Sequence, residues 1–380
     1  MKKYWFIPTG NKVWLQAAIS LYNSKIAVPV LWTGDDRHYN SAKLYFGDAV
    51  FSKQKLCFYP EELETISYDS NNCEFFLSEN YIRAKDRCLK MMDRLDLYGS
   101  FSRIDREVVF NKLCIWILNK FEETTPDALI LVENPHSHTY YLIYEICLYQ
   151  NVQIIKFNRW LNIPVLYAQN LITGERQKVS IKMQEDLSLK FELHIKEFIK
   201  ELSRLNKNDN YILPAIKIQI NGLKFKNKLI NFFKHGIISQ IKEFCFQFRQ
   251  YFSKTYYPIN PYKFGYLLRL WIRFKRKHNL KKSFNKFKVK KDLTKKFVYY
   301  ALSFEPERTT CPDGNEFHDQ IITLIVLRNF LPPEYSIYVK EHPSQFYVAE
   351  KGSRGRSPLF YEAIKNIKGV SLLDEEIDSL

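Results

Sequence analysis

The first 170 residues of the chain alternate short apolar runs with longer amphipathic segments. In one of the longer segments, Trp14, Ala17, Ala18 and Leu21 recur at the i, i+3, i+4, i+7 spacing of one helix face. The apolar runs predict strands at residues 4–8, 26–32, 128–132, 152–157 and 163–167. Short apolar strands separated by helices are typical of a parallel, doubly wound sheet, so we expect the α/β class.

The same alternation returns at the end of the chain. Strands are predicted at residues 297–303, 335–340 and 370–373, with a helix in each interval. A doubly wound nucleotide-binding domain usually has five or six parallel strands, so we expect a second Rossmann-like domain that is incomplete. The predicted organisation is an N-terminal Rossmann-like domain, a helical basic connection and a partial C-terminal Rossmann-like domain, at residues 1–175, 176–296 and 297–380.

Composition and charge narrow the class of protein further. Of the 380 residues, 46% are hydrophobic and 16% are aromatic, which excludes a mostly disordered chain. The net charge of +16 is concentrated in residues 223–297, which hold 21 Lys or Arg and two acidic residues. This segment contributes +19, so the rest of the chain sums to about −3. A local excess of this size points to an anionic partner, such as phospholipid, phosphate or nucleic acid.

Apolar and basic residues within this segment recur at helical spacing. One helix face is predicted to carry Ile230, Phe233, Ile237, Ile241, Phe244 and Phe248. Roughly the opposite face carries Lys228, His235, Lys242 and Arg249. A helix with aromatic and basic residues suits an anionic membrane surface, whereas a solvated helix face is the alternative. No RNP, helix-turn-helix or zinc-finger pattern accompanies the charges, so we do not expect a nucleic-acid partner.

Targeting and metal-binding signals are not found in the sequence. The N-terminal apolar run is too short for a signal peptide, and no stretch approaches the ~18 apolar residues of a membrane span. The seven cysteines form no C-x-x-C pair, and no D-x-D occurs. Glu305 and Glu307 are weak evidence for a metal. We therefore expect a cytoplasmic protein, peripheral at the inner face of the cell membrane, with no cofactor and no metal.

Two polar loops of the C-terminal region follow predicted strands, at residues 304–314 and 341–345. In an open α/β sheet, ligands bind at the carboxyl ends of the strands. Hydroxyl, guanidinium and imidazole groups, together with helix N-terminal amides, suit a phosphate. The groups available in these loops belong to Arg308, Thr309, Thr310, His342 and Ser344. Helix capping and surface ion pairs are the alternative roles for the threonines and the arginine.

These loops form part of a longer pattern. It consists of E-P-E-x-T-T-x-P-x-G-x-x-F-x-D-Q from Glu305 to Gln320, L-P at 331–332, and Y-V-K-E-H-P-S-Q from Tyr338 to Gln345. Over roughly 40 residues the pattern resembles bacterial capsule and surface-polysaccharide biosynthesis proteins, which are distantly similar to the capsular Kdo transferases and polysialyltransferases. The resemblance implies the GT-B fold, in which two Rossmann-like domains face each other.

The resemblance also implies an activity. Such a protein would be a glycosyltransferase of capsular or other surface-polysaccharide biosynthesis that uses a nucleotide sugar, with a CMP-sugar favoured, and a glycan or lipid-linked acceptor. In transferases of this kind an H-P motif contacts the phosphate of the nucleotide sugar, a role that falls on His342 and Pro343. We expect the donor-phosphate site to comprise Arg308, Thr309, Thr310, Lys340, His342, Pro343 and Ser344.

The proton acceptor for the acceptor hydroxyl should come from the N-terminal domain. Asp35, Asp36 and His136 follow predicted strands there and are the candidates, with His342 as a further catalytic residue. The segments that hold them, W-T-G-D-D and Pro-His, are loosely similar to the same family. Turn formation or helix capping is the alternative role of the two aspartates, and a half-buried structural histidine is the alternative for His136.

The chain departs from the family pattern in two respects. Asn315 stands where a second glycine is usual, and the Ser/Thr-rich and Gly-rich motifs that should follow the H-P region do not occur before Leu380. We therefore expect a truncated C-terminal domain with one exposed apolar edge or face, and little transferase activity for residues 1–380 alone. Two other hypotheses stay open: a polyol-phosphate transferase of the teichoic-acid type, and a non-catalytic membrane-associated component of a glycan-assembly complex.

Overall fold

A computed structural model of the chain describes residues 1–52, 73–95, 102–159, 166–177, 266–290, 296–307, 309–346 and 355–374, with isolated positions between these ranges. The chain divides into two compact units. The first comprises Met1–Lys53, Phe121–Asn134 and Cys147–Lys242, and the second comprises Gln54–Lys120, Pro135–Ile146 and Glu243–Leu380.

The domain boundaries after residues 175 and 296 stay predictions. The predicted membrane-facing residues between Lys228 and Arg249 lie outside the described residues.

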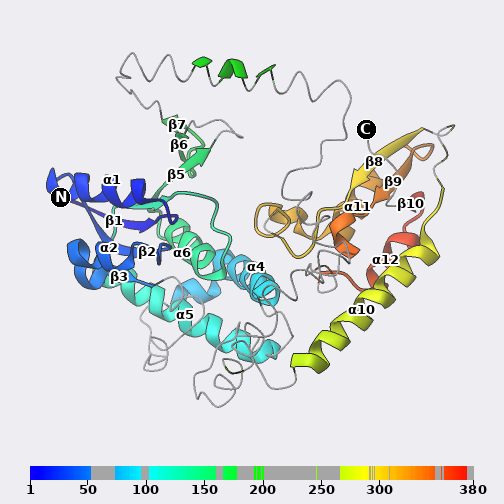
Figure 1. The fold of residues 1–380 in the computed structure, drawn as a ribbon, viewed down its shortest axis with the longest axis horizontal. Helices are drawn as coiled ribbons and strands as arrows, with labels where there is room; N and C mark the ends of the chain where they lie inside the picture. Colours follow the sequence, from blue (N-terminus) through cyan, green and yellow to red (C-terminus); the bar gives the residue numbers. More distant parts are fainter. Residues whose placement is uncertain are drawn as a thin grey trace. The chain divides into compact units, whose positions relative to one another are not determined.

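A seven-stranded sheet organises the first unit (Figure 1), with the strand order β3-β2-β1-β4-β5-β6-β7. Its strands are β1 (Lys2–Ile7), β2 (Ala27–Thr33), β3 (Val50–Phe51), β4 (Ala128–Leu131), β5 (Gln153–Arg159), β6 (Leu166–Asn170) and β7 (Arg176–Gln177). The pairs from β3 to β5 are all parallel, and β1 at their centre is flanked by β2 and β4. This is the order of a Rossmann-like sheet, which confirms the predicted α/β class.

The far edge of this sheet differs from the prediction. We expected the strand near residues 163–167 to continue a parallel sheet, but β6 pairs antiparallel with β5, and β7 pairs antiparallel with β6. The reason is the connection, because only six residues separate β5 from β6. A parallel crossover needs about a dozen residues or more.

The core of the first unit lies between this sheet and two helices, α1 (Lys12–Asn23) and α2 (Tyr39–Phe46). Trp32 of β2 is fully buried and stacks on Phe6 of β1 with ring centroids 5.1 Å apart. Leu15 from α1 and Phe46 from α2 complete the same cluster. The predicted helix is present, but its buried face was predicted only in part: Ala18 is buried, Trp14 and Leu21 are half-buried, Ala17 is exposed, and the buried Leu15 was not on the predicted face.

Between β3 and β5, the residues that the structure describes form three α-helices. They are α4 (Glu79–Leu95), α5 (Arg103–Thr124) and α6 (His138–Tyr149). A short 3-10 helix, Cys73–Leu77, precedes α4. The break falls at Ser78, whose hydroxyl oxygen accepts a hydrogen bond from the Tyr81 backbone N–H at 3.1 Å, as a helix-capping serine does.

A three-stranded parallel sheet organises the C-terminal part of the second unit. Its order is β10-β9-β8, with β8 at Phe297–Ala301, β9 at Ser336–Lys340 and β10 at Val370–Leu373. The crossovers are α11 (Gln320–Phe330) and α12 (Pro358–Asn366). All three strands and both helices fall where the hydrophobic pattern predicts them.

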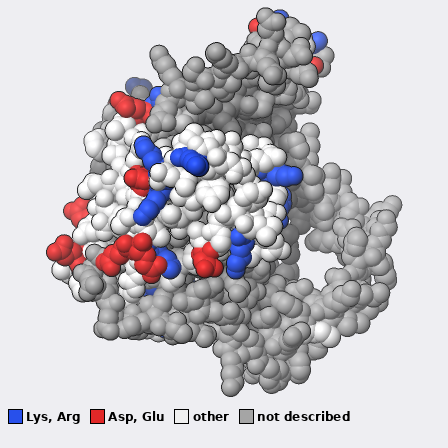
Figure 2. Space-filling view, turned by 90° about the vertical axis from the view of Figure 1, so that its left-hand side faces the viewer, with Lys and Arg blue, Asp and Glu red and all other residues white. Residues whose placement is uncertain are grey.

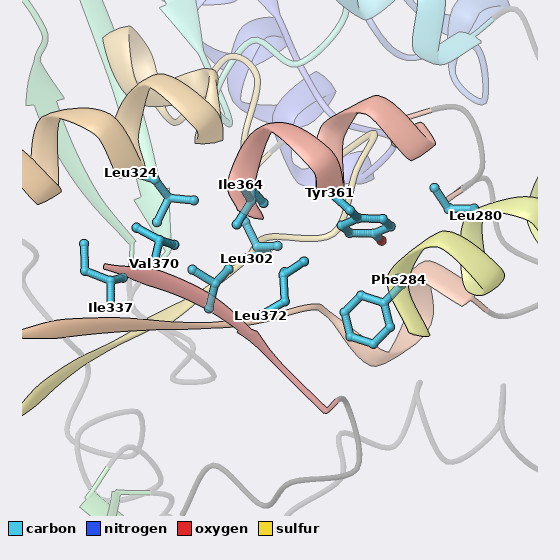
Figure 3. Packing of buried hydrophobic residues seen from close by; sticks show 10 residues of the cluster. Leu280, Phe284, Leu302, Leu324, Ile337, Tyr361, Ile364, Val370 and Leu372 are labelled. Atoms are coloured by element: carbon cyan, nitrogen blue, oxygen red, sulfur yellow. The ribbon is translucent and has the colours of Figure 1, made fainter. Parts of the chain in front are cut away.

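Apolar side chains from the strands, the two crossover helices and α10 (Tyr266–Phe287) form one buried cluster (Figure 3). Leu324 of α11 and Ile364 of α12 extend toward the strand residues Ile337, Val370 and Leu372. From α10, the ring of Phe284 lies 5.3 Å from the ring of Tyr361 and 5.1 Å from that of Phe346. The apolar face of α10 is therefore part of this core.

The opposite face of the small sheet is less covered. Phe297 and Tyr299, which alternate with the core residues of β8, are 39% and 40% exposed. Tyr338 on the neighbouring strand is buried. Its hydroxyl bonds the Asp292 backbone, donating to the carbonyl oxygen at 2.9 Å and accepting from the N–H at 3.1 Å. Part of this face is therefore covered by residues just before β8.

The described surface carries charges of both signs. Figure 2 shows one face of the molecule, on which lysine and arginine side chains are interspersed with aspartate and glutamate side chains. Among the described residues, none of the helices combines the length and hydropathy that crossing a membrane requires.

The position of Phe284 predicts the effect of removing it. Phe284→Ala should destabilise the second unit by about 3 to 5 kcal/mol, because it leaves a cavity between α10 and α12. Phe274→Ala on the same helix is the matched control. Phe274 is 61% exposed, and its loss should change stability by less than about 0.5 kcal/mol. Native-state hydrogen exchange of the β9 amides measures both values. Equal effects of the two changes would show that α10 does not belong to this core.

Candidate functional site

The strand ends of the second unit are joined through one buried carboxylate. Glu341, directly after β9, is fully buried and accepts three hydrogen bonds. The donors are the His342 backbone N–H at 2.8 Å, Arg356 Nε at 3.1 Å and the Tyr361 hydroxyl at 2.7 Å. Arg356 also donates from Nη2 to the Ser303 carbonyl oxygen, 2.9 Å away beyond β8. A buried carboxylate needs such partners, and here they fix the backbone of His342.

Two glutamine side chains complete this polar network. Gln345 accepts from the Glu305 backbone N–H at 3.0 Å and donates to the carbonyl oxygens of Glu305 and Gly352, at 2.9 and 2.7 Å. Gln320 accepts from the Ser303 backbone N–H at 2.8 Å. Glu305, Gln320 and Gln345 all belong to the sequence pattern that carries the family resemblance. The two halves of that pattern therefore meet at the carboxyl ends of β8 and β9.

His342 lies at the edge of this network. Its ring is half-buried and its centroid lies 5.7 Å from that of Phe304. Burial lowers the pKa of His342 below its ordinary value, although the negative charges of Glu341 and Glu307 oppose the shift. A lowered pKa makes the neutral imidazole the main form at neutral pH, and this form can donate one hydrogen bond and accept another.

Of the other residues predicted to bind phosphate, the structure describes the side chains of Lys340, Thr309 and Thr310. Lys340 is the last residue of β9, and strand alternation puts it on the sheet face opposite Ile337 and Val339. Thr309 is exposed, whereas Thr310 is buried and its hydroxyl has no hydrogen-bond partner. The side chains outside the described residues are those of Arg308, Pro343 and Ser344.

Cations from α4 reach the loop that follows β8, a feature that the sequence analysis missed. Lys90 donates to the His318 carbonyl oxygen at 2.9 Å, and its Nζ lies 3.7 Å from Glu305 Oε1. Arg94 donates to the Cys311 carbonyl oxygen at 3.2 Å. Helical spacing puts Lys90 and Arg94 on one face of α4 and could have indicated a basic face. The sequence did not indicate which loop this face would contact.

The loop before α6 contains two histidines in different surroundings. His136, a predicted catalytic residue, is half-buried, and its backbone carbonyl accepts a hydrogen bond from Arg94. His138 is 1% exposed, and its Nδ1 has no hydrogen-bond partner. Burial, reinforced by the positive charge of Arg94, lowers the pKa of His138 to about 4. His138 is therefore neutral at physiological pH.

In the first unit, Asp35 lies in a turn that follows β2. Its carboxylate is buried, and Oδ1 accepts from the backbone N–H groups of Arg37 and His38 at 3.0 and 3.3 Å. Oδ2 lies 2.7 Å from Nδ1 of the His38 ring. The neighbouring Asp36 accepts from the Ser52 hydroxyl at 2.9 Å. Asp35 thus forms the turn and also holds His38, which the sequence analysis did not consider.

Among the described residues, no group of three or more His, Cys, Asp or Glu side chains is arranged to hold a metal ion.

The buried Glu341–Arg356 ion pair predicts that a conservative substitution of Glu341 strongly destabilises the folded protein. Glu341→Gln should lower the free energy of unfolding by about 3 to 5 kcal/mol, because it leaves the Arg356 guanidinium buried without its counter-charge. The control is Glu362→Gln, at an exposed position of α12. That change should leave stability within experimental error. Urea denaturation checks both values, and a Glu341→Gln variant as stable as the wild type would contradict the prediction.

The burial of His138 predicts acid sensitivity. The unfolded imidazole binds its proton near pH 6.5 and the folded one near pH 4, so the unfolded state binds more protons between these values. Stability is unaffected by this group above pH 6.5 and falls as the pH drops through that window, by about 2 kcal/mol at pH 5.

The test of this effect compares two substitutions. His138→Gln removes the titrating group and should flatten the pH dependence of stability between pH 7 and 5. His278→Gln, at an exposed position of α10, is the matched control and should keep the wild-type profile. A His138→Gln profile that runs parallel to the wild-type profile would rule out the assigned pKa shift.

Comparison with known proteins gives little guidance to function. The chain matches no protein-family model and no curated protein. Among solved structures it is similar to the UDP-GlcNAc 2-epimerase from Methanocaldococcus jannaschii, with 13% sequence identity, 98% of this chain and 73% of that chain covered, and a TM-score of 0.21. A TM-score this low carries no argument, so the function must be inferred from the residues of the chain itself.

Proposed function

We propose that the chain is a glycosyltransferase of surface-polysaccharide assembly, which transfers a sugar from a nucleotide-sugar donor to a glycan or lipid-linked acceptor. One observation carries the proposal. The two halves of the family-like pattern meet in a single buried network, and this network holds His342 at the carboxyl ends of β8 and β9. Strand ends of this kind are where open α/β sheets bind their ligands.

The chemistry of the reaction fits such a site. Glycosyl transfer builds negative charge on the leaving phosphate, and fixed hydrogen-bond donors near that phosphate lower the barrier. In this proposal the neutral imidazole of His342 donates to a phosphate oxygen, and its backbone is held in place by Glu341. Arg308, Thr309, Thr310, Lys340, Pro343 and Ser344 remain the proposed companions of His342, and a CMP-sugar remains the favoured donor.

Attachment to an anionic membrane surface remains a proposal for residues 223–297. The described part of this segment that supports it is α10, on which Phe274 is 61% exposed beside the exposed Lys275 and Arg276. Aromatic and basic side chains next to each other suit a membrane surface. Such attachment would place the protein near a lipid-linked acceptor.

Donor binding can be measured without knowing the acceptor. A nucleotide sugar at 100 times its Kd should stabilise the protein by about 2.7 kcal/mol, which a thermal-shift screen of CMP-, UDP- and GDP-sugars detects. His342→Ala should lower donor affinity or kcat at least tenfold, about 1.4 kcal/mol. His278→Ala, at an exposed position of α10, is the control.

Adding CDP-glycerol to this screen, together with a separate binding assay on anionic lipid vesicles, distinguishes the hypotheses. Stabilisation by CDP-glycerol and by no nucleotide sugar would favour a polyol-phosphate transferase. Binding to lipid vesicles without any nucleotide effect would favour a non-catalytic component of a glycan-assembly complex. Unchanged donor binding and turnover in His342→Ala would remove His342 from the donor site.

A further inference from the structure

We propose that Lys90 and Arg94 of α4 are positioning residues of the donor site, because they hold residues 309–318, in the loop that follows β8, in the conformation that binds the donor phosphate. This inference rests on the proposed function. It deepens that function by naming residues outside the family-like pattern on which donor binding depends. Helix α4 and this loop belong to the same compact unit.

Both side chains donate to main-chain carbonyl oxygens of the loop. Lys90 Nζ donates to the His318 oxygen at 2.9 Å, and Arg94 Nη1 donates to the Cys311 oxygen at 3.2 Å. The two cations are four residues apart and therefore share one face of α4. Because the acceptors are backbone atoms, these contacts fix the path of the chain, which includes Thr310 immediately before Cys311.

Each cation also contacts a second segment of the same unit. The Arg94 guanidinium donates from Nη2 to the His136 carbonyl oxygen, in the loop before α6. Lys90 Nζ lies 3.7 Å from Oε1 of Glu305, which belongs to the polar network at the ends of β8 and β9. The loop is therefore tied through α4 to two other candidate parts of the site.

A third side chain of α4 supports an uncommon backbone conformation in the loop. Asn315 has a φ of +47°, in the left-handed region, which is uncommon for residues other than glycine. Arg87 donates from Nη1 to Asn315 Oδ1 at 3.4 Å, and its Nη2 lies 3.1 Å from Glu316 Oε1. The contacts from α4 therefore extend over residues 311–318 and help to keep this conformation.

The position of α4 itself does not depend on these cations. Its apolar face is buried, and the buried side chains on it are those of Ala84, Cys88, Leu89, Met91 and Met92. Burial of apolar side chains on this scale holds a helix in place. The contacts of Lys90 and Arg94 therefore serve the position of the loop rather than that of the helix.

The loop so placed presents a group that suits a ligand. The Thr310 side chain is buried, and its hydroxyl oxygen has no hydrogen-bond partner. A buried polar group without a partner is costly, and a phosphate oxygen would supply the partner. Because Thr310 directly precedes Cys311, the bond from Arg94 to the Cys311 carbonyl acts on the backbone next to this hydroxyl.

The decisive substitution is Lys90→Met, which nearly keeps the length of the side chain and removes its charge and its hydrogen-bond donors. With the nucleotide sugar that gives the largest thermal shift, we expect the Kd to rise at least tenfold. The amides of residues 313–318 should exchange at least tenfold faster, whereas the β9 amides should keep the wild-type rate. Lys90→Arg keeps a charged donor and should restore most of the affinity. Lys282→Met, at an exposed position of α10, is the control.

Saturation with the nucleotide sugar distinguishes positioning from a structural role. A bound donor orders the loop, so exchange of residues 313–318 in Lys90→Met should return to the rate of the donor-bound wild type. Arg94→Met should also raise the Kd at least tenfold, and Arg276→Met on the exposed side of α10 should not.

Two results would contradict the inference, and they differ in what they leave standing. Faster loop exchange in Lys90→Met with an unchanged Kd would overturn the positioning role and leave the proposed function standing. No binding and no turnover of any nucleotide sugar by the unaltered protein would overturn both proposals.

Discussion

The buried carboxylate of Glu341 is the interaction on which the strand ends of the second unit depend. Three donors from separate places in the sequence converge on it, and one of them, Arg356, continues to the backbone beyond β8. Removing a charged group from water is costly, so the carboxylate is tolerable only while all these partners are in place. The same requirement makes the network rigid. It converts a flexible loop after β9 into a fixed support for His342.

The hydrophobic pattern was sufficient to predict most of the fold. Strands β1, β2, β4, β5, β8, β9 and β10 lie at short apolar runs or alternations, and the pattern contains that information locally. The two-residue strands β3 and β7 were not predicted. The pairing of β6 was not predictable in this way. A strand in a parallel sheet and one in an antiparallel sheet can have the same composition, and only the length of the chain between β5 and β6 distinguishes them.

The candidate site was predictable in part, for a different physical reason. Strand ends identify where polar loops gather, so His342 and Asp35 could be chosen from their positions alone. Contacts between segments that lie far apart in the sequence could not be predicted in this way. The amino-acid sequence does not indicate that Gln345 forms hydrogen bonds with the backbone of Glu305, or that Lys90 of α4 contacts the same loop. His38 was missed because a spacing of three residues from an aspartate also describes an ordinary helix cap.

Burial affects three histidines of this chain differently. His138 is so deeply buried that burial lowers its pKa to about 4, and it is neutral but inaccessible. At His342, burial also lowers the pKa, and the network holds the backbone of the residue through Glu341. His38 differs from both, because a buried carboxylate fixes its ring while part of the side chain stays exposed.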